Sequence, residues 1–319
     1  DLMGWIGGNR GGKFFVFIHV MGTHDPYLSR APYNTMFGSD YNGSMPALDR
    51  DGFWGLWKAK NAELKSAGKS EIGLDEFYWA LADDRNIDEV EEAFPGYRRF
   101  ISSVKGGGSR VANHDRIVAL YDGTIREADA FFGKFIEGLE SEGLLDESII
   151  IVNGDHGEGF NEHGLYGHSY GLYEELLHIP LALRLPGQAD GARVKAQVRM
   201  TDMLPTLITL LGLKVEQGVK EQMDGVDIFR AVKENPEYVF PIFQKYDTVK
   251  FQKSKIAKET SLSLQSQDGW KVIYNLHTDE IQLCNFGEDR FCTENVAESE
   301  PEKTAQMKET LFKHFGYAE

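Results

Sequence analysis

Short apolar runs that alternate with one long helical stripe predict an α/β fold, with helices flanking a mixed central sheet. Two apolar runs, 149–152 and 179–185, are bounded by Gly and Pro, which is typical of buried strands, and the first consists entirely of β-branched residues. A third run, KFFVFIHV over 13–20, is continuously apolar and predicts a central strand. A helical stripe over 114–142 lies between these runs, and such alternation is typical of α/β proteins.

The helical stripe begins at Asn113 or His114 and continues to about Glu142, where Gly143 predicts its end. Its apolar residues recur three or four positions apart, which is the period of an amphipathic helix. They are Ile117, Leu120, Tyr121, Ile125, Ala128, Phe131, Phe132, Phe135 and Leu139.

A long intervening region, 28–110, separates the first predicted strand from this helix. Aromatic and charged residues stand at helix-compatible spacing within it, over 49–67 and 73–94. It reads either as a helical insertion that packs its own aromatic residues or as a cap over the substrate entrance. The glycine-rich stretch 105–109 is a plausible flexible end to it.

The pattern of the C-terminal part predicts different elements from those of the preceding region. An apolar helix is expected over 201–213, with Thr201 as its N-cap. From about 238 onwards, short predicted strands alternate with tight turns, and an amphipathic helix follows. The strands are expected over 239–245, 261–265, 270–274 and 280–286, and the helix over 302–315. We therefore expect a core over 1–237, including the 28–110 insertion, and a small α+β subdomain with an antiparallel sheet over 238–319.

Composition limits the partners. The 319 residues carry 34 basic and 50 acidic side chains, a formal charge of −16, which disfavours nucleic acid. An anionic ester stays compatible with this charge, because a bound metal ion can invert the local field. No apolar run is long enough to span a bilayer. The two cysteines, Cys284 and Cys292, either close a small loop in an oxidising compartment or remain ordinary thiols.

Asp155 and His156 stand where the apolar run 149–152 ends in a glycine-rich loop. A carboxylate, an imidazole and backbone freed by glycine can converge on one divalent cation, and imidazole favours Mn or Zn. The alternative is a strand-end turn in which Asp155 caps the next segment. His163 and His168 follow closely, and their density favours a site. His178, next to the second run, is expected to be a packed core residue.

The stretch GDHGEGFNEHGLYGHSYGLYEELLHIPLALRLPG resembles the sulfatase branch of the alkaline-phosphatase superfamily. In that family the first two residues of an Asp-His-Gly or Asp-Asn-Gly strand end bind the metal. A basic residue, usually Lys, stands twelve positions after the second of them, and here that position is His168. A strand followed by a His-x-Pro-Tyr-like turn matches 13–27 and places His24. The resemblance covers about 12–30 and 114–230, and more loosely 268–315.

The resemblance implies roles for four residues. Asp155 and His156 would be metal ligands, with Ca as the family's usual ion and Mn or Zn as alternatives. His24 and His168 would be substrate-binding and catalytic residues that contact the sulfate and the leaving oxygen. A small-molecule or glycan sulfate ester would be the substrate, and family habit places such enzymes in the periplasm or outside the cell.

One family feature has no match. The Cys-x-Pro-x-Arg or Ser-x-Pro-x-Arg signature, whose first residue becomes the formylglycine nucleophile, does not occur in the sequence. We therefore expect the formylglycine upstream of this chain, which would be a later part of a sulfatase and inactive alone. Three alternatives stay open: a phosphoester or phosphonate ester hydrolase, a phosphoethanolamine-type transferase with a Thr nucleophile, and a non-catalytic binding relative.

Overall fold

The computed structural model describes residues 2–38, 40–43, 45, 50–82, 113–164, 166–168, 171–234, 242–252 and 255–317. The chain forms two compact units. The first contains Asp1–Tyr170 and Glu175–Gln188, and the second contains Gly171–Glu174 and Ala189–Glu319. The main change of unit therefore falls after Gln188, whereas the sequence places a boundary after residue 237. The earlier boundary includes a helical segment with the C-terminal sheet, and independent folding of 238–319 stays a proposal.

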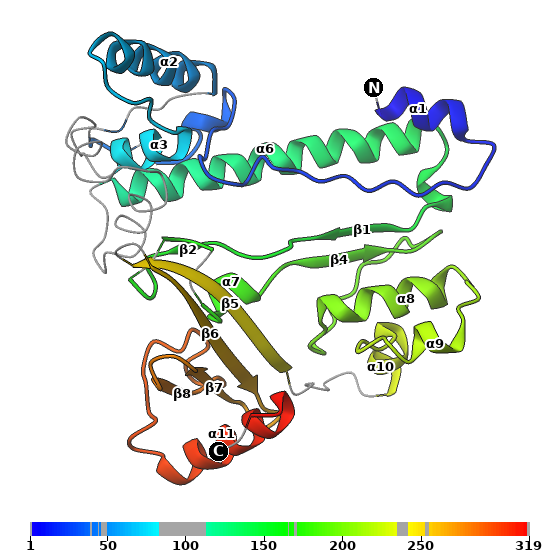
Figure 1. Ribbon diagram of the computed structural model, residues 1–319. Coiled ribbons are helices and arrows are strands. Elements are labelled where there is room, and N and C mark those ends of the chain that lie inside the picture. The colour runs from blue at the N-terminus through cyan, green and yellow to red at the C-terminus, as the bar shows by residue number, and fades with distance from the viewer. Residues whose placement is uncertain are drawn as a thin grey trace. The chain divides into compact units, whose positions relative to one another are not determined.

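A single long helix organises the first unit. Helix α6 (His114–Ser141) confirms the predicted stripe, and Gly143 follows it with a positive φ of 70°. Helix α1 (Leu2–Asn9) packs against the C-terminal half of α6 through Ile6 and Leu139. Helices α2 (Arg50–Ser66) and α3 (Leu74–Ala82) lie at the other end of α6 (Figure 1).

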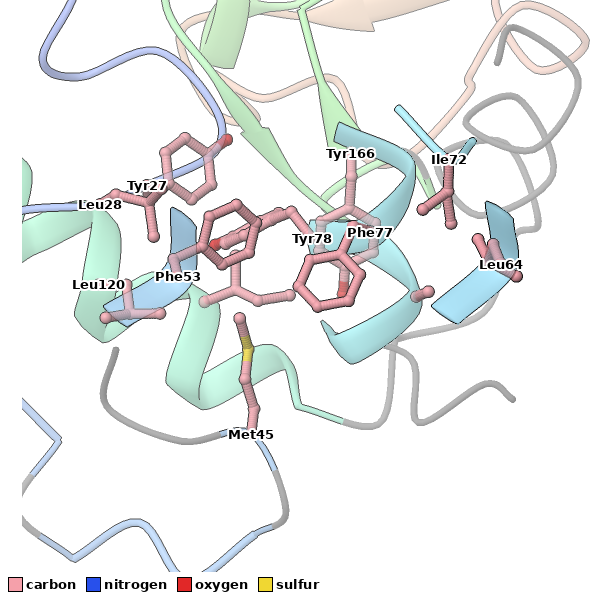
Figure 2. Close-up of a cluster of buried hydrophobic side chains, with 12 residues drawn as sticks. Tyr27, Leu28, Met45, Phe53, Leu64, Ile72, Phe77, Tyr78, Leu120 and Tyr166 are labelled. Carbon is pink, nitrogen blue, oxygen red and sulfur yellow. The ribbon is translucent and has the colours of Figure 1, made fainter. Parts of the chain in front are cut away.

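The main core of the first unit lies where α2 and α3 meet the N-terminal turns of α6. Phe53 and Tyr78 are fully buried there, and Ile117 and Leu120 complete the contact from α6. Figure 2 shows Tyr27 and Tyr166 joining the same cluster from segments that carry the site residues described below. The helices predicted within 28–110 therefore pack their own aromatic residues over the described part, and the stretch 83–112 lies outside it. A cap role for this region stays a proposal.

Two short antiparallel pairs of strands flank the loop that carries Asp155 and His156. Strand β1 (Ile150–Asn153) pairs with β4 (Leu181–Arg184), with Asn153 opposite Leu181. Strands β2 (Gly159–Phe160) and β3 (Tyr166–Gly167) form a small hairpin. Both predicted apolar runs thus form strands, but neither is fully buried, since Val152 of β1 is 41% exposed and Ala182 of β4 is exposed as well.

The predicted central strand over 13–20 is wrong as an element. This segment forms no strand and has no backbone hydrogen-bond partner among the residues that the structure describes. Phe15 and Phe17 are 76% and 79% exposed. An apolar run becomes a strand only when another strand accepts its N–H and C=O groups.

The second unit begins with short helices around Asp202. They are η3 (Met200–Asp202), α8 (Met203–Leu210), α9 (Gln217–Lys220) and α10 (Ile228–Glu234). The predicted N-cap Thr201 is wrong, because Asp202 stands at the N-cap of α8 and its buried carboxylate accepts from the Arg199 and Val226 N–H groups.

A four-stranded antiparallel sheet with one helix completes the second unit, as predicted. The strands β5 (Ile242–Gln252), β6 (Lys255–Gln265), β7 (Trp270–Asn275) and β8 (Ile281–Asn285) pair in chain order. Helix α11 (Pro301–Phe315) packs Leu311 and Phe312 against Leu262 and Leu283 of the sheet. No helix in the described part of the chain is both long and apolar enough to cross a bilayer.

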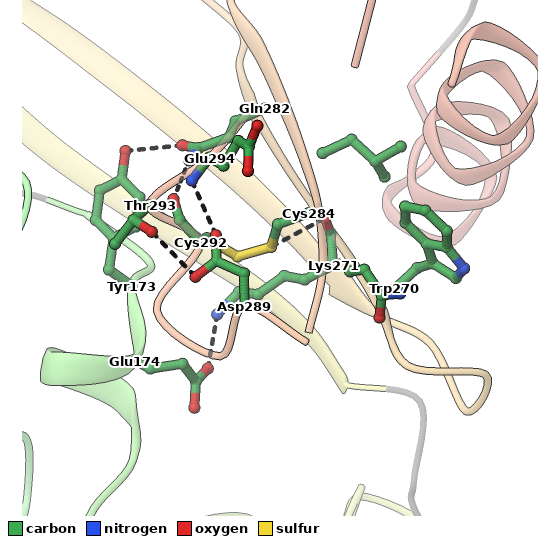
Figure 3. Close-up of a disulfide and its surroundings, with 12 residues drawn as sticks. Tyr173, Glu174, Trp270, Lys271, Gln282, Cys284, Asp289, Cys292, Thr293 and Glu294 are labelled. Atoms are coloured by element: carbon green, nitrogen blue, oxygen red, sulfur yellow. Dashed lines mark hydrogen bonds and ion pairs between the residues drawn. A yellow bond between two sulfur atoms is a disulfide. The ribbon is translucent and has the colours of Figure 1, made fainter. Parts of the chain in front are cut away.

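Residues 171–174 belong to the second unit and contact its sheet, although they are distant from it in sequence (Figure 3). The Lys271 ammonium lies 2.8 Å from a carboxylate oxygen of Glu174, and both side chains are buried. The Tyr173 hydroxyl donates to Gln282 at 3.1 Å. Cys284 and Cys292 are joined by a disulfide, which resolves the two alternatives that the sequence left open.

Candidate active site

The candidate site begins where β1 ends. Gly154 N–H donates to the Pro180 carbonyl at 3.2 Å, and Gly157 N–H donates to the Leu176 carbonyl at 2.8 Å. A Cβ atom at Gly157 would lie 2.0 Å from the Glu175 carbonyl oxygen, so only glycine allows this close approach of two backbones. The loop that carries Asp155 and His156 is therefore anchored at both ends.

Asp155 and His156 lie side by side with exposed polar atoms. Their side chains are 72% and 40% exposed, and Asp155 Oδ2 lies 3.8 Å from His156 Nε2. Partial burial, the largest single effect, raises the pKa of Asp155. Hydrogen bonds from the Asp155 and His156 N–H groups and the charges of His156 and His19 outweigh it, so the pKa lies below its ordinary value. The carboxylate is thus charged at neutral pH.

These two residues fit part of a divalent metal site. His156 Nδ1 lies 2.7 Å from the Gly157 carbonyl oxygen, which can only accept, so Nδ1 carries the proton. In a neutral ring, Nε2 then presents a lone pair towards the negative Asp155 oxygen, and a cation between them would relieve the repulsion. A carbonyl partner on the other nitrogen is typical of metal-binding histidines. Within the described ranges, no group of three or more His, Cys, Asp or Glu side chains could hold a metal ion. Asp155 and His156 could therefore supply only part of a metal site within the described ranges.

His24 is held by the residue that follows it. Its Nδ1 lies 2.7 Å from the Asp25 carbonyl oxygen and 3.1 Å from Asp25 Oδ1. The hydrogen bond to the Asp25 carboxylate raises the pKa of His24 to about 9, against the opposing effect of partial burial. His24 is therefore a cation at neutral pH, and its Nε2–H is a donor suited to an anion.

His168 lies between the two other histidines in space. Its ring stacks on His156, with centroids 4.1 Å apart and planes 25° apart. On its other contact it meets His24 edge to face at 5.0 Å. The three imidazoles form a continuous row, which we call the histidine row, and Asp155 lies at the His156 end of it. The structure thus brings together all four residues that the sequence singles out.

Two further histidines lie outside this row. His163 Nδ1 is 2.7 Å from Glu175 Oε1, with side chains 11% and 4% exposed, so this pair ties the β2–β3 hairpin to the segment before β4. His178 is exposed, and the expectation of a packed core residue is therefore wrong. An adjacent apolar run does not decide which way a side chain turns.

Sequence reasoning missed three side chains near the row. Asp25 and Glu158 are buried carboxylates, 3% and 5% exposed, that contact His24 and His168. His19 is close enough to Asp155 for its charge to lower the pKa of that carboxyl. Weak signals existed: Asp25 adjoins a candidate histidine, Glu158 stands between two glycines, and His19 interrupts an apolar run.

Asp155 thus lies exposed beside stacked imidazoles at the end of a strand in an α/β unit, an arrangement whose chemistry suits a cation next to an anionic group. The chain belongs to the sulfatase family, because the model of that family, described as Sulfatase, matches residues 1–213. Arylsulfatase K of Xenopus laevis is 25% identical over 197 residues, which cover 61% of this chain and 36% of that protein. The multifunctional alkaline phosphatase superfamily protein PehA of Trinickia caryophylli is 26% identical over 212 residues, which cover 65% and 36%. The chain therefore spans about 36% of the length of these curated relatives.

Solved structures show the same fold. The phosphonate monoester hydrolase SpPMH from Silicibacter pomeroyi matches with a TM-score of 0.62 at 19% identity, over 97% of this chain and 56% of that one. The phosphonate monoester hydrolase of Agrobacterium radiobacter matches with a TM-score of 0.59 at 20% identity, over 99% and 59%. The chain thus has the mixed α/β fold of the sulfatase and alkaline-phosphatase group, as the sequence predicts.

Proposed function

We propose that this chain supplies part of the active site of a sulfuric ester hydrolase, a sulfatase that uses a divalent metal. The observation that carries the proposal is the histidine row beside Asp155, which brings the two proposed metal ligands next to the two proposed anion contacts. Membership of the sulfatase family supports the reaction class.

Asp155 and His156 would hold the metal through Oδ2 and Nε2. Ca is the family's usual ion, and Mn or Zn would suit the imidazole. When bound, the ion would screen the charge of the sulfate, and a formylglycine upstream of this chain would supply the nucleophile. Asp155 contributes the negative charge of the pair, because its pKa is lowered.

His24 and His168 would contact the transferring group. The pKa of His24 is raised to about 9, so the ring is protonated at neutral pH. Its Nε2–H can then donate to a sulfate oxygen while Nδ1–H stays bonded to Asp25. His168 would present Nε2 to the leaving oxygen, because its Nδ1 faces Glu158 at 3.1 Å. A histidine at this position could act as general acid, which contributes about 10²- to 10⁴-fold in rate.

The substrate would be a small-molecule or glycan sulfate ester. The name of the Xenopus laevis relative makes an aryl sulfate the first probe. By family resemblance, the protein would act in the periplasm or outside the cell, and the disulfide Cys284–Cys292 is consistent with an oxidising compartment.

A second candidate is hydrolysis of phosphoesters or phosphonate monoesters. PehA, a relative at 26% identity, is named a multifunctional protein of the alkaline phosphatase superfamily, which supports this alternative. Sulfatases usually carry lysine at the position of His168. A histidine there is compatible with a sulfate ester and with a phosphate or phosphonate ester. A phosphoethanolamine-type transferase and a non-catalytic relative are the remaining alternatives.

Two experiments test the proposal. The coding DNA immediately upstream of Asp1 should carry a Cys-x-Pro-x-Arg or Ser-x-Pro-x-Arg signature, whereas a Thr nucleophile there would favour phosphoryl transfer. The protein expressed from that reading frame should hydrolyse 4-nitrophenyl sulfate faster than matched phosphonate and phosphate monoesters. Faster phosphonate hydrolysis would replace the first candidate by the second, and no hydrolysis of any ester would favour a binding role.

A further inference from the structure

The side chain of Glu158 is buried next to His168 of the histidine row. Glu158 follows Gly157, whose backbone is pressed against the Glu175 carbonyl and bonded to Leu176. This close approach determines the path of the loop before β2, and the Glu158 side chain is only 5% exposed. A carboxylate with this burial is costly unless a charged or donating group faces it.

One group that faces it is His168. The two carboxylate oxygens of Glu158 lie 3.1 and 3.4 Å from the same atom, His168 Nδ1. An ionised carboxylate only accepts hydrogen bonds, so Nδ1 must carry the proton. The opposite nitrogen of the ring, Nε2, is then the atom that His168 presents to other groups.

Aromatic neighbours make the contact water-poor. The burial of Tyr27 and Tyr121 raises the pKa of both hydroxyls, and the charge of Glu158 adds to both shifts. A hydrogen bond to a charged acceptor is stronger in such surroundings than in water. The Glu158 charge also adds to the raised pKa of His24, so one carboxylate acts on both anion-contacting histidines.

We infer that Glu158 is a positioning residue that holds the His168 ring in one orientation with a proton on Nδ1, so that Nε2 faces the substrate and carries the transferable second proton when the ring is cationic. The inference rests on the proposed role of His168 in ester hydrolysis. It also explains how a histidine serves where the family usually has lysine. A lysine ammonium donates in any orientation, whereas an imidazole needs a partner on Nδ1 to fix which nitrogen it presents.

The test is the tautomer of His168 in this chain, measured by NMR with ¹⁵N-labelled histidine at alkaline pH, where an unperturbed imidazole is neutral. His168→Asn assigns the signal by its loss. Glu158→Ala should move the His168 ring nitrogens from an Nδ1–H pattern towards the mixture seen for free imidazole. Glu158→Gln retains an acceptor but loses the charge. The proton should therefore remain on Nδ1 of His168, and its NMR signal should move to higher field because the hydrogen bond is weaker.

Glu162→Ala is the matched control, because Glu162 is an exposed carboxylate on the same hairpin and binds the Phe160 N–H. It should leave the His168 signal unchanged. Nitrogen shifts of His168 that are the same in Glu158→Ala and the parent protein would overturn the inference. If Glu158→Ala does not fold, the folded variant Glu158→Gln decides. An Nδ1 proton signal of His168 at the same chemical shift in Glu158→Gln and the parent protein would also overturn the inference.

The same variants separate this inference from the proposed function. In the active enzyme, Glu158→Ala should lower kcat for an aryl sulfate about 10- to 100-fold, with a smaller effect on KM. An Nδ1–H pattern that depends on Glu158 in a protein without esterase activity would refute the proposed function and leave the positioning role intact. Esterase activity in the parent protein, together with a His168 tautomer that Glu158→Ala leaves unchanged, would support the proposed function and refute the positioning role.

Discussion

The imidazoles of His24 and His168 meet edge to face, with ring centroids 5.0 Å apart and planes inclined by 70°. Each ring has a buried carboxylate on its Nδ1, Asp25 for His24 and Glu158 for His168. Both Nδ1 atoms therefore face a carboxylate, although the rings come from distant parts of the chain, and Nδ1 of His24 lies closer still to the Asp25 carbonyl oxygen. In the proposed reaction, their Nε2 atoms would contact the anionic group.

The pKa of His24 makes stability depend on pH. The folded pKa is raised from 6.5 to about 9, so the protonated ring stabilises the fold fully below pH 6.5, and this contribution is lost as pH rises through about 9. An NMR titration of His24, assigned with His24→Asn, should show a midpoint near 9, and Asp25→Asn should return it towards 6.5. A midpoint that Asp25→Asn leaves unchanged would show that Asp25 is not the cause.

His168→Ala should slow the active enzyme most with poor leaving groups, because protonation of the departing oxygen matters least when that oxygen is already a stable anion. The measurement is kcat/KM for a series of aryl sulfates with different phenol pKa values. His178→Ala, an exposed histidine near the same loop, is the control and should leave the series unchanged. Equal losses across the series would count against the acid role.

A divalent ion should stabilise the chain through Asp155 and His156. At an ion concentration of about 100 times Kd, the free energy of unfolding should rise by about 2.7 kcal/mol, and EDTA should reverse the effect. Thermal unfolding of the parent protein and of Asp155→Ala, with and without Ca²⁺, measures this. Glu140→Ala, an exposed acidic change on α6, should keep the full response. Equal stabilisation of parent and Asp155→Ala would place the ion elsewhere.

Lys271→Met should destabilise the second unit strongly, because it leaves the buried Glu174 carboxylate without its cation (Figure 3). We expect a loss of about 3–5 kcal/mol in the free energy of unfolding. Lys303→Met is the matched control, since its ion pair with Asp268 is more exposed and should contribute at most about 1 kcal/mol. Urea unfolding compares the two, and similar losses would mean that burial does not decide the strength of this pair. Adding Glu174→Gln to Lys271→Met should recover part of the loss.

Gly157→Ala should destabilise the first unit and disturb the site loop. The added Cβ would lie 2.0 Å from the Glu175 carbonyl oxygen, and overpacking of this kind costs about 1–3 kcal/mol. At Gly191 the same change meets nothing within 4 Å and should alter stability by less than about 0.5 kcal/mol. Unfolding by urea compares both variants, and an equal, small effect would show that the loop can move away.

Much of the fold follows from local patterns. The period of the apolar residues predicts α6 within one residue at each end, and the alternating runs predict β7, β8 and α11 closely. The run over 13–20 has an equally strong local pattern but no strand partner in the described part of the chain, so it forms no strand. Strand formation depends on a second segment, and local composition carries no information about whether that segment is present.

Order and spacing in the sequence determine which chemistry this chain carries: a carboxylate and an imidazole at a strand end, a histidine twelve positions later and another after the first apolar run. They also determine where glycine allows the loop to pass close to another backbone. Only the tertiary structure decides that His168 lies between His156 and His24, that His163 turns to Glu175 and that Asp25 and Glu158 lie beneath the row. The physical reason is that hydrogen bonds and ring contacts depend on positions in space, which distant segments acquire only by packing together.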